Sequence, residues 1–149
     1  GAVSPDLRHL DVVVARELTY RDMTEETKRG FVPFGGCFVA DPKLTVFLRQ
    51  AASESHLGCI ATGDLFVHSQ AEKDRLRQDY NALCAEMEGA AVAHVCAVNR
   101  VPFGVIRCIS DLANDEAHGD YEQFERLASL KSADILCEVI RLYSEKEGE

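Results

Sequence analysis

Short apolar runs alternate with helical stretches along this chain of 149 residues, and that alternation restricts the folds open to it. The apolar runs are 11–15, 57–62, 83–85 and 102–109. Their Val, Ile, Leu and Phe content, and the Gly, Pro and Asp residues beside them, favour extended structure. Strands that alternate with helices of ten or more residues predict parallel pairing, because the crossover helices must cover both sheet faces. We therefore predict a three-layer α/β/α fold with a mixed, largely parallel central sheet.

Four stretches have the character of helices, at 42–52, 69–80, 89–98 and 120–143. In the first, Asp41 supplies an N-cap, Pro42 suits the first helical position, and apolar residues then recur at helical spacing. Ser69 is a candidate cap for the second. The segment 19–36 is polar and then rich in Gly and Pro, so we predict a loop there.

The composition excludes several classes of partner. Sixteen Lys and Arg residues against 25 Asp and Glu residues give a formal net charge of −9, which repels nucleic-acid backbones and anionic membrane surfaces. The apolar stretch near 90–98 is interrupted by His94 and falls short of the roughly 20 residues that a membrane span requires. We therefore expect a soluble chain with neither nucleic acid nor a membrane as its partner.

Six cysteines are spread singly through apolar surroundings, with no C-x-x-C pair and no His at ligand spacing. We interpret them as reduced core residues in a cytoplasmic protein and expect no metal. A disulfide framework or a zinc site is the alternative. It is disfavoured because the hydrophobic content of a domain of this size can supply a core without such links.

Two polar clusters follow predicted strands, where an α/β fold places its ligands. Glu86-Met87-Glu88 ends one strand and begins a helix. These acids either stabilise the helix start or grip a ribose diol, since a carboxylate can accept from two adjacent hydroxyls. Arg107 to Asp111 ends another strand, with Arg107, Ile109 and Asp111 on one side by alternation. This cluster is either an ion pair with a turn-capping Asp or an acid that serves a heterocycle.

These clusters belong to a longer pattern. Its parts are Gly63-Asp64-Leu65-Phe66-Val67, Ala85-Glu86-Met87-Glu88-Gly89, Ala93-His94-Val95-Cys96 and Arg107-Cys108-Ile109-Ser110-Asp111. Over nearly the whole chain the pattern resembles the 5′-methylthioadenosine/S-adenosylhomocysteine nucleosidases of the nucleoside phosphorylase superfamily. The resemblance implies a homodimeric cytoplasmic enzyme that binds a small adenine nucleoside and needs no cofactor. Its reaction would be hydrolysis of the N-glycosidic bond, releasing adenine and a 5-thioribose.

The resemblance also implies catalytic roles for three residues. Asp111 matches the acid that protonates purine N7, which makes adenine a competent leaving group. Glu88 matches the ligand of the ribose 2′,3′-diol. Arg107 matches a residue that places Glu88 and the attacking water.

Six further residues are assigned to substrate binding by the same resemblance. Phe66 would stack on adenine while the backbone of Val67 reads the edge of the base. Met87 would form the apolar floor beneath the sugar, and Tyr121 would cover the 5′-alkylthio group. The remaining two are Ser110, which would steady Asp111, and Glu86, the other acid near the sugar.

The chain also departs from the family pattern. The family's general-base glutamate lies in a portion that would precede Gly1, so we expect 1–149 to be one nucleosidase-like domain without its N-terminal strands, and a poor catalyst alone. Tyr20-Arg21-Asp22 stands where Tyr-His-Asp is more usual, in a loop that the resemblance places at the dimer contact. Two alternatives stay open: a purine nucleoside phosphorylase of the same superfamily, and a non-catalytic nucleoside-binding relative or inactive fragment.

Overall fold

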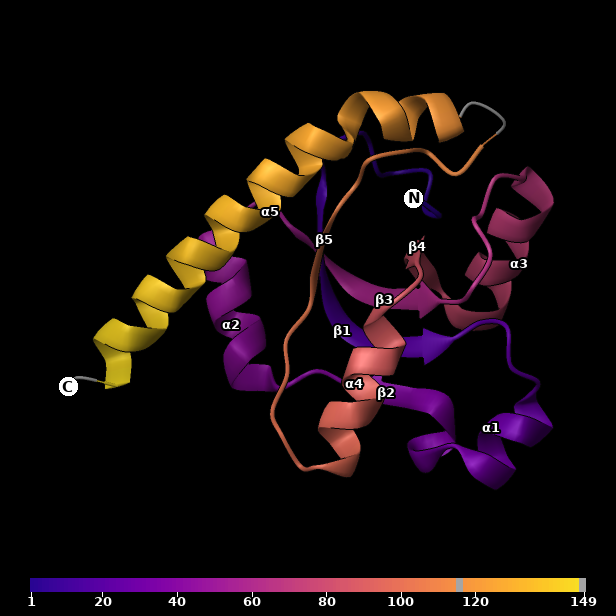
Figure 1. The fold of residues 1–149 in the computed structure, drawn as a ribbon, viewed down its shortest axis with the longest axis horizontal. Helices are drawn as coiled ribbons and strands as arrows, with labels where there is room; N and C mark the ends of the chain where they lie inside the picture. Colours follow the sequence, from indigo (N-terminus) through magenta and orange to yellow (C-terminus); the bar gives the residue numbers. More distant parts are fainter. Residues whose placement is uncertain (115–116, 148–149) are drawn as a thin grey trace.

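Strands and helices alternate in the computed structural model, which describes residues 1–114 and 117–147 (Figure 1). In chain order the elements are β1 (Val12–Tyr20), α1 (Glu25–Phe31), the 3-10 helix η1 (Pro33–Gly36), β2 (Cys37–Val39), α2 (Pro42–Ala51), β3 (His56–Thr62), α3 (Gln70–Tyr80), β4 (Ala82–Glu86), α4 (Gly89–Val98), β5 (Ile106–Cys108) and α5 (Ala117–Glu147). None of the helices described is both long enough and apolar enough to span a bilayer.

The strands form one mixed five-stranded sheet in the order β2-β1-β3-β4, with β5 also paired to β1. β1, β3 and β4 are parallel, so their carboxyl ends at Tyr20, Thr62 and Glu86 lie along one edge. β2 and β5 are both antiparallel to β1. They share the side of β1 away from β3, because β5 pairs with Val12–Val14 and β2 pairs with Glu17–Thr19.

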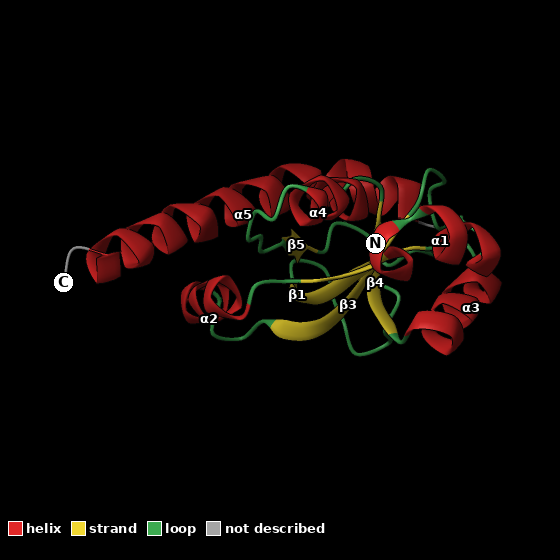
Figure 2. Cartoon of the chain, turned by 90° about the horizontal axis from the view of Figure 1, so that it is seen from below, coloured by secondary structure: helices red, strands yellow, loops and turns green. Residues whose placement is uncertain are grey.

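Both faces of the sheet are covered, as the three-layer prediction requires. Neighbouring residues of one strand point to opposite faces, and Ile60 and Ala61 of β3 enter different apolar clusters. The cluster around Ile60 includes Ala93 of α4, and the cluster around Ala61 includes Leu76 of α3. Figure 2 shows α4 and α5 above the strands and α3 to the lower right. The predicted α/β/α architecture is therefore confirmed.

The predicted starts of two helices, α2 and α3, are also confirmed. The Asp41 side chain accepts from the amide of Leu44 (2.9 Å) at the start of α2, and the Ser69 hydroxyl accepts from the amide of Glu72 (3.3 Å) at the start of α3. Each bond satisfies an amide that has no partner inside its helix. The observed α5 extends beyond the predicted 120–143 at both ends.

Two sequence expectations about secondary structure are wrong. The segment 19–36 is not simply a loop, because β1 continues to Tyr20 and the Thr24 hydroxyl caps the short helix α1 by accepting from the amide of Thr27 (3.1 Å). The predicted strand 102–109 is reduced to β5. Its leading residues bond to separate neighbours, with the carbonyls of Phe103 and Val105 accepting from the amides of Asp41 and Ala15, so no ladder forms there.

The six cysteines are free. Cys59 and Cys84 lie in the core, and burial raises the pKa of each thiol to about 12. Cys137 is exposed on α5, and Cys37, Cys96 and Cys108 are only partly buried, so the expectation that all six are core residues holds fully only for Cys59 and Cys84.

Candidate active site

A cavity of about 810 Å³ lies between the end of β4, the loop 63–68, the segment around β5 and one face of α5. All nine residues singled out from the sequence line it. They are Phe66, Val67, Glu86, Met87, Glu88, Arg107, Ser110, Asp111 and Tyr121. Residues far apart in the chain are thus brought to one cavity, although this placement alone does not assign their roles.

Glu86 is the structural acid of the pair that ends β4. Its side chain is only 9% exposed. One oxygen accepts from the Thr62 hydroxyl, and the other accepts from the amides of Gly89 (2.7 Å) and Glu88 (3.2 Å) at the start of α4. The Thr62 hydroxyl in turn accepts from the amide of Ala90 (2.8 Å). Glu86 therefore joins the end of the sheet to the first turn of α4.

Glu88 is the open acid of the pair. Its side chain is 69% exposed, and Arg107 Nη2 lies 3.2 Å from its Oε2. The same Arg107 nitrogen also contacts Glu86, so one guanidinium spans both carboxylates. Arg107 Nε is buried and has no partner among the described residues. Glu88 thus retains oxygen lone pairs that face the cavity while Arg107 holds its position.

Asp111 does not lie at the carboxyl end of a parallel strand, where it was expected from the sequence, although it still lines the cavity. Because β5 is antiparallel to β1, its tip points away from the edge where β1, β3 and β4 end. The chain then turns, and the Asp111 carbonyl accepts from the amide of Ala2 (2.8 Å), which is bridged to Cys84 of β4. That bridge brings Asp111 alongside the end of β4.

The Asp111 carboxyl group is held firmly in a buried position. The residue is 1% exposed, and its oxygens accept from the Ser110 hydroxyl (2.9 Å) and the Ala113 amide (3.0 Å). Gly1 passes so close that an added Cβ there would lie 2.2 Å from Asp111 Oδ1. A buried carboxyl group with two local donors and one side toward a cavity can exchange a proton with a bound heterocycle.

Two aromatic rings form an apolar wall. Phe66 and Tyr121 meet edge to face with ring centroids 6.3 Å apart. Burial raises the pKa of the Tyr121 hydroxyl, and a hydrogen bond to Glu125 and the negative charges of Glu88 and Asp111 act in the same direction. The wall therefore stays neutral at physiological pH and can pack against the flat face of a ligand.

Several cavity residues were missed from the sequence. Glu125, Ser129 and Ser132 follow Tyr121 along the same face of α5. Their helical spacing from Tyr121 was the available signal. Arg21 also lines the cavity, and its sequence signal was its place in the Tyr20-Arg21-Asp22 departure. Among the described residues no group of three or more His, Cys, Asp or Glu side chains could hold a metal ion.

A family model of the phosphorylase superfamily matches residues 1–141. The chain belongs to the phosphorylase superfamily. The match covers every strand and all nine cavity residues named above, so the site lies within the region that defines the family.

Relatives of this superfamily member include nucleosidases of two named kinds. It is 35% identical to an aminodeoxyfutalosine nucleosidase of Helicobacter pylori over 144 residues, covering 91% of this chain and 62% of that one. It is 37% identical to the 5′-methylthioadenosine/S-adenosylhomocysteine nucleosidase of Bacillus subtilis over 147 residues, covering 93% and 60%. The chain thus spans about three fifths of the length of these curated relatives.

Solved structures agree with this placement. The Neisseria meningitidis 5′-methylthioadenosine/S-adenosylhomocysteine nucleosidase, in complex with methylthio-immucillin-A, superposes with a TM-score of 0.86 at 29% identity, covering 94% of this chain and 65% of that one. The futalosine hydrolase of Helicobacter pylori superposes with a TM-score of 0.87 at 33% identity, covering 95% and 64%. The resemblance to the nucleosidases that the sequence motifs indicated is confirmed.

Proposed function

We propose that this chain carries the nucleoside site of an enzyme that hydrolyses the N-glycosidic bond of 5′-methylthioadenosine/S-adenosylhomocysteine-type nucleosides, releasing adenine and a 5-thioribose. The observation that supports this most is that Glu88 and Asp111, an open and a buried carboxyl group, line one cavity with the Phe66 ring. A sugar ligand, a proton donor for the base and a stacking surface are then available to one molecule.

The sugar half of the proposed site centres on Glu88. Its exposed carboxylate can accept from two adjacent hydroxyls, and the contact with Arg107 keeps it oriented. Met87 is 42% exposed beside it and provides an apolar surface for one face of the ribose ring. Glu86 supports this half indirectly. Its oxygens are occupied by four donors, among them the Glu88 amide and the Arg107 guanidinium, so it holds the residues around the sugar rather than the sugar itself.

The base half centres on Asp111. In its protonated form the carboxyl group would donate to purine N7, so that adenine leaves as a neutral molecule while positive charge develops on the sugar. Ser110 holds one carboxyl oxygen, and Phe66 and Tyr121 provide apolar surface beside the base and the 5′ group. We assign the backbone of Val67, which lines the cavity next to Phe66, to the edge of the base.

Hydrolysis is favoured over phosphorolysis because the relatives and solved structures described above are named nucleosidases or hydrolases. The test is to incubate the native gene product with 5′-methylthioadenosine, in the presence and in the absence of phosphate, and to measure the adenine released by chromatography. We expect release without phosphate, and a strict phosphate requirement would favour the phosphorylase alternative.

Calorimetry with adenine completes this test. Saturable adenine binding without any release of product would favour a non-catalytic relative. A protein that neither binds adenine nor releases it would refute the proposal.

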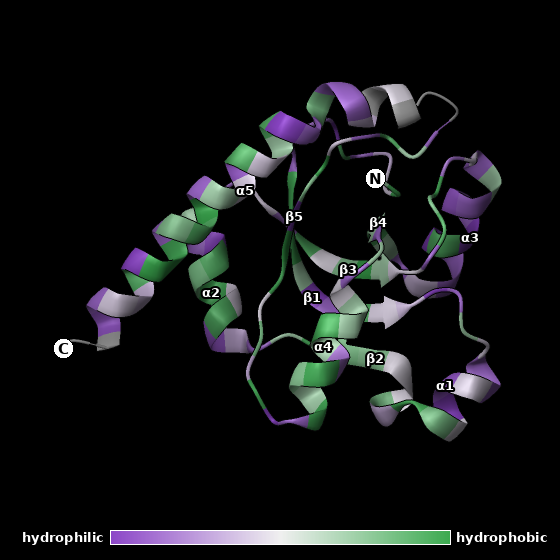
Figure 3. Cartoon of the chain, viewed as in Figure 1, coloured by the Kyte–Doolittle hydropathy of each residue, from purple (hydrophilic) through white to green (hydrophobic). Residues whose placement is uncertain are grey.

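We also propose that two copies associate through α4, in a cytoplasmic homodimer. α4 packs against η1 and β2, yet Val92, Val95 and Val98 are all more than half exposed, as are Phe31 and Phe34 nearby. Figure 3 shows α4 coloured as hydrophobic along most of its length. A helix that is apolar on both sides is expected to be buried by a partner.

The oligomeric state tests this proposal. Light scattering should give twice the chain mass for the parent protein and the single mass for Val95→Asp. Val46→Asp, at a similarly exposed position on α2, should leave the dimer intact. A monomeric parent would exclude it.

A further inference from the structure

We propose that Arg21 is a positioning residue that holds the loop 63–68, and with it Phe66 and Val67, in the geometry needed to receive the base. The assignment of the base to this loop rests on the proposed function. The ordering of the loop by Arg21 rests on the contacts of the described residues alone.

Arg21 lies directly after β1 and is 4% exposed. Its amide donates to the Thr62 carbonyl (2.8 Å), which extends the pairing of β1 with β3 by one residue. The backbone of Arg21 is thus fixed by the sheet. A buried guanidinium loses its hydration and must recover hydrogen bonds inside the protein. Arg21 does so through Nη1 and Nη2, while its buried Nε has no partner among the described residues.

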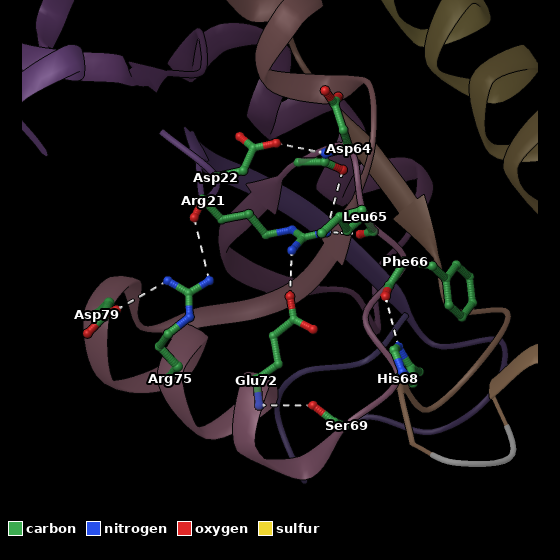
Figure 4. Close-up of polar contacts among 11 residues, drawn as sticks. Arg21, Asp22, Asp64, Leu65, Phe66, His68, Ser69, Glu72, Arg75 and Asp79 are labelled. Carbon is green, nitrogen blue, oxygen red and sulfur yellow. Dashed lines mark hydrogen bonds and ion pairs between the residues drawn. The ribbon is translucent and has the colours of Figure 1, made fainter. Parts of the chain in front are cut away.

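The guanidinium joins the loop to α3 (Figure 4). Nη1 donates to Glu72 Oε1 at 2.6 Å, and Nη2 contacts the carbonyls of Leu65 and Gly63, the latter at 3.5 Å. One rigid group therefore contacts the sheet end, the loop and the first turn of α3. The next residue adds a second tie, because the Asp22 carboxylate accepts from the amide of Asp64 (2.8 Å).

The loop is also anchored at its ends, because the Gly63 amide donates to the Glu86 carbonyl (3.1 Å) and the Val67 side chain is 5% exposed within an apolar cluster. It contains no helix or strand, and Leu65 is 72% exposed. Gly63 admits the arginine, because an added Cβ there would lie 2.8 Å from Arg21 Cγ and 2.9 Å from Nε. Phe66 and Val67 follow within four residues of this crossing. The guanidinium therefore fixes the carbonyls that directly precede Phe66, while the Val67 side chain is also held by its burial in the core.

A lysine at position 21 cannot make the contacts of the Arg21 guanidinium. Arg presents several N–H groups in a fixed plane, so Nη1 and Nη2 can serve acceptors in two directions at once. The single ammonium of a lysine would satisfy either Glu72 or the loop carbonyls. We therefore expect Arg21→Lys to keep the charge and release the loop.

The test combines hydrogen exchange with adenine binding in the full chain. In Arg21→Lys, amides 64–68 should exchange about 10-fold faster or more, while amides of β3 keep the parent rates. The Kd for adenine should rise by up to about 100-fold, the size of loss that a misplacement of about 1 Å can cause. The pH dependence of activity should stay unchanged, because Asp111 is not displaced.

Two further variants keep the inference falsifiable. Glu72→Gln retains an acceptor for Nη1 but loses its charge, so we expect a smaller change in the same direction, and it tests the loop if Arg21→Lys does not fold. Arg75→Lys is the matched control, because Arg75 lies on α3 and its polar partners within 1–114 and 117–147 are the backbone carbonyl of Arg21 (3.5 Å) and Asp79, not the loop. It should keep the parent exchange rates and adenine affinity.

The outcomes separate this inference from the proposed function. Faster exchange spread evenly over the sheet, or parent rates throughout 64–68 in both Arg21→Lys and Glu72→Gln, would overturn the positioning role. A parent protein that binds no adenine would instead refute the proposed function and the base-receiving part of the inference. The exchange data would then still decide whether Arg21 orders the loop.

Discussion

Glu86 and Glu88 are separated by one residue, yet they should respond very differently to replacement by glutamine. Glu86 accepts from four donors and is 9% exposed, whereas Glu88 has one ionic contact and is 69% exposed. A hydrogen bond to a charged acceptor stabilises by about 1 kcal/mol more than a neutral one. Three of the four donors share one oxygen of Glu86: the amides of Glu88 and Gly89 and the Arg107 guanidinium. If each of these bonds loses about 1 kcal/mol, Glu86→Gln should lower the free energy of unfolding by about 3 kcal/mol.

For a chain of this size the change corresponds to a fall in Tm of about 6–12 °C. Glu88→Gln breaks only an exposed pair, and should cost less than about 0.5 kcal/mol.

Urea unfolding followed by circular dichroism measures both values. The reasoning fails if the two variants are equally stable, or if Glu86→Gln unfolds within about 1 kcal/mol of the parent. For activity we expect Glu88→Gln to have an effect that it does not have on stability. Under the proposed function Glu88→Gln should reduce kcat/KM while the fold stays intact.

Two further outcomes follow from other buried groups. Asp111→Asn should lower kcat/KM by about 10²- to 10⁴-fold, the range for loss of a general acid, with circular dichroism unchanged; near-parent activity would remove Asp111 from the chemistry. Because burial raises the pKa of Cys59 and of Cys84 to about 12, the folded state retains protons that the unfolded thiols release above about pH 9. The free energy of unfolding should therefore fall with rising pH by about 1.4 kcal/mol per pH unit for each thiol. Urea titrations between pH 8 and 10.5 should show this slope in the parent and in Cys137→Ala, and a clearly shallower slope in the Cys59→Ala/Cys84→Ala double variant, where burial still raises the pKa of the Cys37 and Cys108 thiols.

Local signals predicted much of the fold. α2 begins where Asp41 and Pro42 place it, and α3 begins after Ser69, because capping depends on residues close in sequence. β2 was missed because its three residues are extended only by pairing with β1, a tertiary effect. β5 was overextended because apolar content cannot show which backbone groups find ladder partners.

The sequence predicted which residues form the candidate site better than it predicted their burial and contacts. Glu86, Glu88 and Asp111 do line one cavity, but nothing in the Glu86-Met87-Glu88 segment shows that the first acid is enclosed and the second open. That difference comes from Thr62 and Arg107, which lie on other strands. Arg21 stood out only as a departure from the family pattern, and its contacts could not be predicted because its partners are 42 to 51 positions away in sequence.

The wall that α5 contributes to the cavity has a practical implication for changing substrate preference. Tyr121, Glu125, Ser129, Ser132 and Leu136 line the cavity from this single helix, while the proposed sugar and proton-donor groups come from the sheet side. A combinatorial library restricted to these five codons would change this side of the cavity lining and leave Glu88 and Asp111 in place. Laboratory selection for nucleosides with bulkier 5′ groups could therefore begin from this one helix.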